Sequence, residues 1–164
     1  LFTDQIELYI PPKKGKAHVL RIIRELIQYE PKSNKTNISQ ALEYLSKVMK
    51  KKAIVFLISD FMTQDYDQKL KIAAKKHDIT GIRIFDEREK EMPNVGLVLM
   101  EDAETGEEIH VNTGDKEVRL NYAKHFDEKE KHFKSIFMKS GAGTINTSVN
   151  ESYVKKLLAY FKAR

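Results

Sequence analysis

The sequence offers two side chains whose chemistry could form a ligand site: the carboxylate of Asp60 and the hydroxyl of Thr36. Asp60 directly follows an apolar run, Ala53–Ser59, which has the composition of a buried strand. In parallel α/β sheets, ligands bind just beyond the carboxyl ends of the strands, which is where this pattern places Asp60. A carboxylate and a hydroxyl at such an edge suit a hard cation such as Mg²⁺, which takes oxygen ligands.

The segment between these two residues is expected to bring them to one edge of the sheet. Apolar residues at helical spacing predict a helix that begins near Thr36 or Asn37 and extends to Met49. Roughly thirteen helical residues span about 20 Å at ~1.5 Å each. The strand that follows is predicted to be buried on both faces, and it returns about the same distance in roughly seven residues at ~3.3 Å each. Thr36 and Asp60 are therefore expected on the same rim.

The rest of the chain alternates between helical and extended patterns. Apolar stripes predict further helices at residues 19–27, 66–73, 118–137 and 154–161. Strands are predicted at Gln5–Ile10, at Ile79–Phe85 and at residues 142–147, and a hairpin is predicted around the turn Glu104–Glu107. Repeated alternation of strand and helix favours an α/β sandwich with a mainly parallel sheet, formed as a single domain over residues 1–164.

Composition excludes several classes of site. The formal net charge is +5 and the pI is near 9.2, but the lysines are spread along the whole sequence, so no nucleic-acid partner is predicted. The absence of cysteine excludes disulfides and thiolate ligands and suits a cytoplasmic protein. No apolar run approaches the ~20 residues needed to cross a bilayer, so no membrane segment is predicted in this chain.

Purely structural roles are also open for the two candidate ligands. Asp60 could cap the turn that follows its strand. Thr36 could be the N-cap of its helix, a role that hydroxyl side chains often fill. Ser59 lacks the Gly-x-Ser-x-Gly context of a hydrolase nucleophile.

A series of short motifs resembles one bacterial family across essentially the whole chain. The motifs are Leu1–Gly15, Lys35–Ile38, Leu57–Phe61, Phe85–Glu89, Val95–Val98 and Glu104–Glu107. They are similar to domain of unknown function fifty-eight (DUF58), which is related to von Willebrand factor A-type domains. The resemblance implies a doubly wound sheet in a three-layer sandwich, with the hairpin as an insertion. It also implies a metal-ion-dependent adhesion site, in which Thr36 matches the threonine and Asp60 the final aspartate.

The chain departs from that pattern at the other expected ligands. The Asp-x-Ser-x-Ser loop of the adhesion site does not occur in it, and Asn37 stands where the family has an aspartate. The chain also begins at Leu1-Phe2 without methionine, so we expect an N-terminally truncated domain whose loop lies upstream. Thr36 and Asp60 alone form an incomplete metal site, and no cofactor is predicted in this fragment. Mg²⁺ or Mn²⁺ would be the ion of the intact domain, which could also carry a membrane tether upstream.

The resemblance implies a non-enzymatic protein-interaction module, an adaptor that binds a MoxR-type AAA+ ATPase at the carboxyl rim of its sheet. The alternative is a phospho-acceptor or a Mg-dependent enzyme that uses Asp60. A receiver-type site needs an acidic pair after an earlier strand, and no such pair precedes Asp60. No phosphate-binding Gly-x-x-x-x-Gly-Lys motif occurs either. The interaction module is therefore preferred.

In the resembled fold, the truncation removes a central strand. The unpaired backbone that remains on an apolar strand recruits another chain. The strand at Gln5–Ile10 then either shifts inward to pair with the central strand of its own chain or pairs with a second copy. We expect the second arrangement, a homodimer through the truncated sheet in which this strand completes the sheet of a neighbour.

Overall fold

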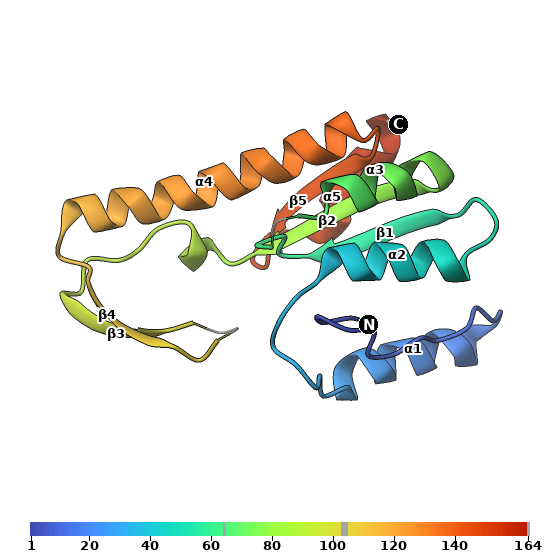
Figure 1. Ribbon diagram of the computed structural model, residues 1–164, viewed down its shortest axis with the longest axis horizontal. Coiled ribbons are helices and arrows are strands. Elements are labelled where there is room, and N and C mark those ends of the chain that lie inside the picture. The colour runs from blue at the N-terminus through green and yellow to red at the C-terminus, as the bar shows by residue number, and fades with distance from the viewer. Residues whose placement is uncertain (64, 103–104, 164) are drawn as a thin grey trace.

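The computed structural model describes residues 1–63, 65–102 and 105–163, and its centre is a parallel sheet (Figure 1). The strands β1 (Ile54–Ser59), β2 (Asp78–Phe85) and β5 (Gly143–Ser148) pair in the order β1-β2-β5. The strands β3 (Leu97–Glu101) and β4 (Glu108–Asn112) form a separate antiparallel hairpin. The parallel α/β sheet and the hairpin predicted from the sequence are thus confirmed. Glu104 of the predicted turn lies outside the described residues.

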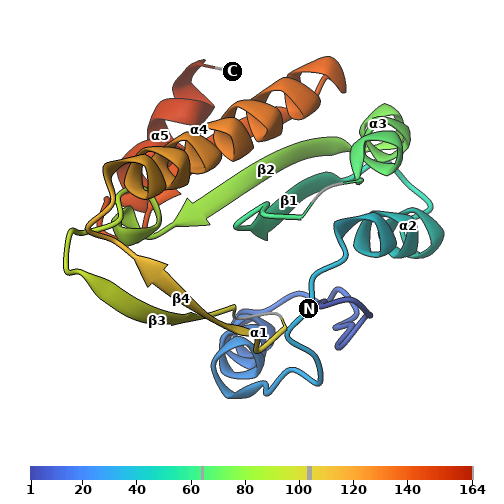
Figure 2. The same ribbon diagram turned by 60° about the vertical axis from the view of Figure 1, so that its left-hand side comes forward.

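Helices cover both faces of this sheet. The helices α2 (Ile38–Val48), α3 (Asp67–Lys76) and α4 (Lys116–Lys139) pack on one face, where their buried side chains meet Leu57 of β1 and Ile79 of β2. The helix α5 (Tyr153–Ala163) lies on the other face, where the Phe161 ring contacts Phe56 (Figure 2). The result is a mixed α/β fold, consistent with a doubly wound sheet.

The close approach of α4 to the sheet depends on Gly81, in the middle of β2. A Cβ atom at this position would lie 2.5 Å from the ring of Phe137 and 2.9 Å from that of Phe133, both on α4. Both rings are fully buried. A glycine at the centre of the strand therefore gives α4 the space to place its aromatic side chains in the core.

The expectation that β1 is buried on both faces is wrong. Leu57 is 7% exposed beneath the helices, whereas on the opposite face Ile54 is 68%, Phe56 42% and Ile58 55% exposed. The reason is that α5, the helix on that face, packs mainly on β5 and leaves most of β1 uncovered. β1 also lies at the edge of the sheet, since β2 is its only partner among the described residues. In both views the N-terminal segment and the helix α1 (Lys16–Gln28) lie beyond this free edge (Figure 2).

The strand predicted at Gln5–Ile10 is also wrong. The segment contains one isolated bridge, between Phe2 and Ile6, and no strand. The segment is held by side-chain hydrogen bonds instead, since the Glu7 carboxylate accepts from the hydroxyls of Thr3 (2.7 Å) and Tyr29 (3.0 Å). These bonds tie the segment to the end of α1. No helix within the described ranges is long and apolar enough to traverse a bilayer.

Candidate functional site

Asp60 lies at the carboxyl end of β1, as expected, with its side chain exposed to solvent. Its carboxylate accepts hydrogen bonds from the backbone N–H of Met62 (3.2 Å) and from the hydroxyl of Ser59 (3.3 Å). The Ser59 hydroxyl in turn accepts from the N–H of Phe61 (3.1 Å). Asp60 therefore caps its own turn, the structural role left open by the sequence, while part of its carboxylate faces outward.

The loop that carries Asp60 has an unusual backbone held by core packing. Phe61 and Asp65 have positive φ angles of 55° and 67°, a region that non-glycine residues rarely adopt. The Phe61 ring is 1% exposed and lies 4.5 Å from the ring of Phe133 and 5.3 Å from that of Phe137, between centroids. Burial of this ring stabilises the left-handed turn directly after Asp60.

Two helices fix the same loop through its carbonyl groups. The Lys129 ammonium of α4 donates to the carbonyl of Met62 (2.9 Å). The Ser39 hydroxyl of α2 donates to the carbonyl of Asp65 (2.7 Å). The start of α2 therefore meets the loop after β1, which is the meeting of helix start and strand end that the sequence predicted. We call residues 60–63 and 65 the rim loop.

Thr36 precedes α2 by two residues and is half-buried. It is not the N-cap, because the Asn37 side chain fills that position and accepts from the N–H of Gln40 (2.9 Å). Within the described ranges, neither the hydrogen bonds nor the ion pairs join Thr36 to Asp60. The structure thus brings together the elements that carry the two residues, and their action as a metal pair stays a prediction.

A cavity of about 620 Å³, the rim pocket, opens beside Asp60. Its walls come from the rim loop, the segment after β2, the β3–β4 hairpin and α4. The lining residues are Asp60, Met62, Glu89, Met100, Glu101, Asp102, Glu107, Ile109, Tyr122, His125 and Phe126. The lining thus combines several carboxylates with apolar and aromatic side chains. Among the described residues, no group of three or more histidine and carboxylate side chains has the arrangement of a metal site.

Arg83 of β2 lies behind this pocket, with its side chain fully buried under α4. Its Nε donates to the carbonyl of Asp60 (3.1 Å), and its guanidinium carbon lies 4.5 Å from the ring centroid of Phe126. Its Nη1 lies 3.5 Å from the Asn146 side-chain oxygen and 3.8 Å from the Glu130 carboxylate. One buried cation therefore contacts the rim loop, β5 and α4 together.

The electrostatics of this region follow from burial and close charges. Burial lowers the pKa of the Arg83 guanidinium, an effect that the Glu130 carboxylate opposes. Burial works against ionisation of Glu130 as well, yet its bond with Lys134 and the charge of Arg83 hold the pKa of Glu130 below its usual range. In the pocket, burial and the Glu89 carboxylate raise the pKa of Tyr122. The Glu130 carboxylate is thus charged and the Tyr122 phenol neutral near pH 7.

Sequence reasoning missed Arg83 and most of the rim pocket. A signal for Arg83 was present, since a charged residue stands in the otherwise apolar and neutral run Ile79–Phe85. The pocket had no such signal, because Glu101, Glu107 and Tyr122 meet Asp60 only through the placement of the hairpin and α4.

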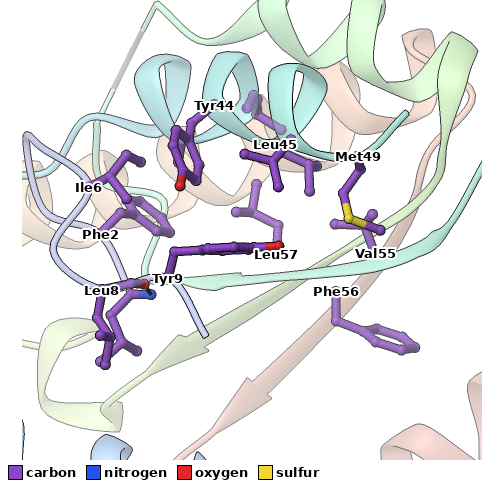
Figure 3. Close-up of a pocket in the computed structure, with 14 residues that line it drawn as sticks. Phe2, Ile6, Leu8, Tyr9, Tyr44, Leu45, Met49, Val55, Phe56 and Leu57 are labelled. Atoms are coloured by element: carbon purple, nitrogen blue, oxygen red, sulfur yellow. Dashed lines mark hydrogen bonds between the residues drawn. The ribbon is translucent and has the colours of Figure 1, made fainter. Parts of the chain in front are cut away.

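A second cavity, of about 240 Å³, lies beside the free edge of β1 (Figure 3). We call it the edge cavity. It is lined by apolar side chains of the N-terminal segment, α2 and β1, among them Phe2, Ile6, Leu8, Tyr44, Leu45 and Leu57. Ile6 and Leu8 therefore line a cavity of their own chain. The dimer predicted by exchange of a strand at Gln5–Ile10 has no structural basis, because this segment forms no strand.

The comparisons with known proteins identify the family of this α/β chain. The model of the family described as "Protein of unknown function DUF58" matches residues 1–132, so the chain belongs to the DUF58 family. An uncharacterised protein of Mycobacterium avium is 22% identical over 158 residues, which cover 94% of this chain and 93% of that protein. An uncharacterised protein of Mycobacterium tuberculosis is 29% identical over 101 residues, which cover 59% of this chain and only 32% of that protein.

Among solved structures, the chain is similar to the crystal structure of the conserved hypothetical protein BatB from Bacteroides thetaiotaomicron. The TM-score is 0.44 at 13% sequence identity, and the match covers 88% of this chain and 67% of that one.

Proposed function

We propose that this chain is a non-enzymatic protein-interaction module whose partner docks in the rim pocket. The observation that carries the proposal is a set of four carboxylates in that pocket that form no ion pair within the described part of the chain. Among the described residues, Asp60, Glu89, Glu101 and Glu107 take part in no ion pair, although the chain as a whole has a net charge of +5. Such a pocket selects a cationic side chain from a partner surface.

The apolar part of the pocket defines the rest of that partner. Met62, Tyr122 and Phe126 line it together with the carboxylates. An aromatic ring beside a carboxylate favours the long side chain of arginine or lysine, which offers an apolar stem and a charged end. The partner surface that fits is therefore a basic residue flanked by apolar ones.

The motifs Lys35–Ile38 and Leu57–Phe61 support the finer form of this proposal, because they resemble those of the DUF58 family, which is related to von Willebrand factor A-type domains. In that form the sheet belongs to a von Willebrand factor A-like fold, and the partner is a MoxR-type AAA+ ATPase in the cytoplasm, where ATP is present. Thr36 and Asp60 are then a remnant of an adhesion site, and Mg²⁺ or Mn²⁺ would act only with the further ligands of an intact domain.

A calorimetric titration with the MoxR-type ATPase of the same organism tests the function. Glu107→Lys places a lysine in the rim pocket, whereas Glu128→Lys makes the same change of charge on the exposed surface of α4. We expect Glu107→Lys to weaken binding by about tenfold or more, and Glu128→Lys to change it by less than about twofold. Equal effects of the two substitutions, or no binding of the wild-type chain, would contradict the proposal.

We also propose that a second copy pairs along the free edge of β1. Lys51 and Lys52 precede this strand and Asp60 follows it, so antiparallel pairing of two copies sets the lysines of one beside the aspartate of the other. Light scattering at micromolar concentration should then report a dimer. A monomer whose mass does not change with concentration would exclude this assembly.

A further inference from the structure

The rim pocket has two walls that meet at one buried side chain. Asp60 forms part of the wall on the rim loop, and Phe126 forms part of the wall on α4. Arg83 reaches both from behind, by its hydrogen bond to the Asp60 carbonyl and by the stacking of its guanidinium on the Phe126 ring. The relative position of the two walls therefore depends on where the guanidinium lies.

The surroundings of Arg83 prevent this guanidinium from moving. In the sheet, Arg83 is flanked by Ser59 of β1 and Asn146 of β5 in register. The Asn146 side-chain oxygen and the Glu130 carboxylate hold its Nη1 side, and Phe85 stacks at 5.2 Å. These contacts hold the planar guanidinium in one orientation, in which its Nε donates to the carbonyl of Asp60.

Simple packing does not explain a guanidinium at this position. Its side chain is 0% exposed, and its Nη2 has no hydrogen-bond partner. A buried cation with an unsatisfied donor is less favourable for stability than an apolar side chain of similar length. The feature that an apolar side chain could not supply is the directional bond to Asp60 together with the ionic contact to α4.

We infer that Arg83 is the positioning residue of the rim pocket: its guanidinium fixes the Asp60 wall against the Phe126 wall and keeps open the space that a partner enters. The inference rests on the proposed function for the nature of that partner. It makes Arg83 essential for binding without any contact between Arg83 and the partner.

Hydrogen exchange of the rim loop gives a reading that does not need the partner. The amides of Phe61 and Met62 report on the loop, because they donate to Ser59 and to the Asp60 carboxylate. We compare Arg83→Met, which keeps the length and removes the charge, with Thr80→Val, which removes a buried hydroxyl near the other end of the same strand. Affinity for the MoxR-type ATPase is measured on the same proteins.

In Arg83→Met, we expect these two amides to exchange at least about tenfold faster than any loss of global stability explains, and ATPase binding to weaken by a similar factor. In Thr80→Val, both amides should follow global stability alone. Arg83→Lys keeps the charge but lacks the planar guanidinium, so it should speed the exchange of the two amides by at least about threefold. This variant replaces Arg83→Met in the test if Arg83→Met does not fold.

Loop exchange that follows global stability in both Arg83 variants would overturn the inference. Wild-type protein that binds no ATPase would refute the proposed function, and the exchange of the loop would still decide the role of Arg83. A loop that opens in Arg83→Met while ATPase affinity stays unchanged would also overturn the inference.

Discussion

The helices α4 and α1 have apolar stripes of the same kind in the sequence, yet only α4 buries its stripe in the fold. α4 buries Phe126, Phe133, Ile136 and Phe137 against the sheet. α1 buries no residue, and Val19, Leu20, Ile23, Leu26 and Ile27 are between 47% and 78% exposed. The comparison teaches that a helical stripe predicts which face is apolar, whereas the presence of a surface to cover that face is a property of the whole fold.

The same contrast divides the two sides of the sheet. On the side of α4, the rim loop is held by Arg83, Lys129 and the ring of Phe61. On the free side, β1 exposes apolar residues and its backbone edge. We therefore expect substitutions to have large effects near α4 and small effects near α1.

The largest expected effect is on the aromatic core. Phe133→Ala should lower the free energy of unfolding by about 3–5 kcal/mol, because it removes a fully buried ring. Ile23→Ala on α1, where the side chain is 47% exposed, should change it by less than about 1 kcal/mol. Urea denaturation of both variants measures the difference, and equal losses would show that α1 is packed in solution.

The fold was more predictable than the site, for a physical reason. Local periodicity identified β2, the β3–β4 hairpin and α4, since these patterns record which side chains are buried. It failed at Gln5–Ile10, because an alternating segment forms a strand only beside another strand, and here Glu7 bonds to Thr3 and Tyr29 instead. Asp60 and the meeting of its loop with α2 followed from strand and helix lengths. Arg83 and the pocket required the placement of α4 and the hairpin, which no local pattern encodes.

A second effect is expected from His77, at the end of α3. This side chain is 2% exposed, neither ring nitrogen has a hydrogen-bond partner, and burial together with the Lys76 charge lowers the pKa of His77. Because the folded pKa lies below the unfolded value of about 6.5, the neutral ring favours the folded state above that pH. This contribution is lost as the pH falls from about 6.5 through the folded pKa.

Unfolding free energies measured from pH 7.5 to pH 5 test this expectation. His77→Leu should flatten the loss of stability in this range, whereas His110→Leu on the exposed hairpin should leave it in place. The same slope in the wild type and in His77→Leu would contradict the role of His77.

A smaller effect is expected from divalent cations. Because Thr36 and Asp60 are only two of the ligands that the family resemblance implies, Mg²⁺ and Mn²⁺ should bind the isolated chain with a Kd above about 100 μM. That limit corresponds to a binding free energy of about 5.5 kcal/mol. Calorimetric titration of the wild type and of Asp60→Ala measures this. Tighter binding that disappears in Asp60→Ala would mean that the two residues hold a metal ion by themselves.

The smallest expected effect is on covalent chemistry at Asp60. If the chain is the interaction module proposed above, the Asp60 carboxylate should not be phosphorylated by acetyl phosphate. Intact-protein mass spectrometry checks this, with Asp60→Asn as the control. A phosphate adduct on the wild type that is absent from Asp60→Asn would favour the phospho-acceptor function.

The most direct test of the central claim is a hydrogen-exchange footprint of the chain bound to the MoxR-type ATPase. The proposed function predicts new protection at the rim loop, at Met100–Glu101 and Glu107–Ile109 of the hairpin, and at Tyr122–Phe126 of α4. It predicts unchanged exchange on α1. Protection confined to α1 and the free edge of β1, with the rim pocket unaffected, would contradict it.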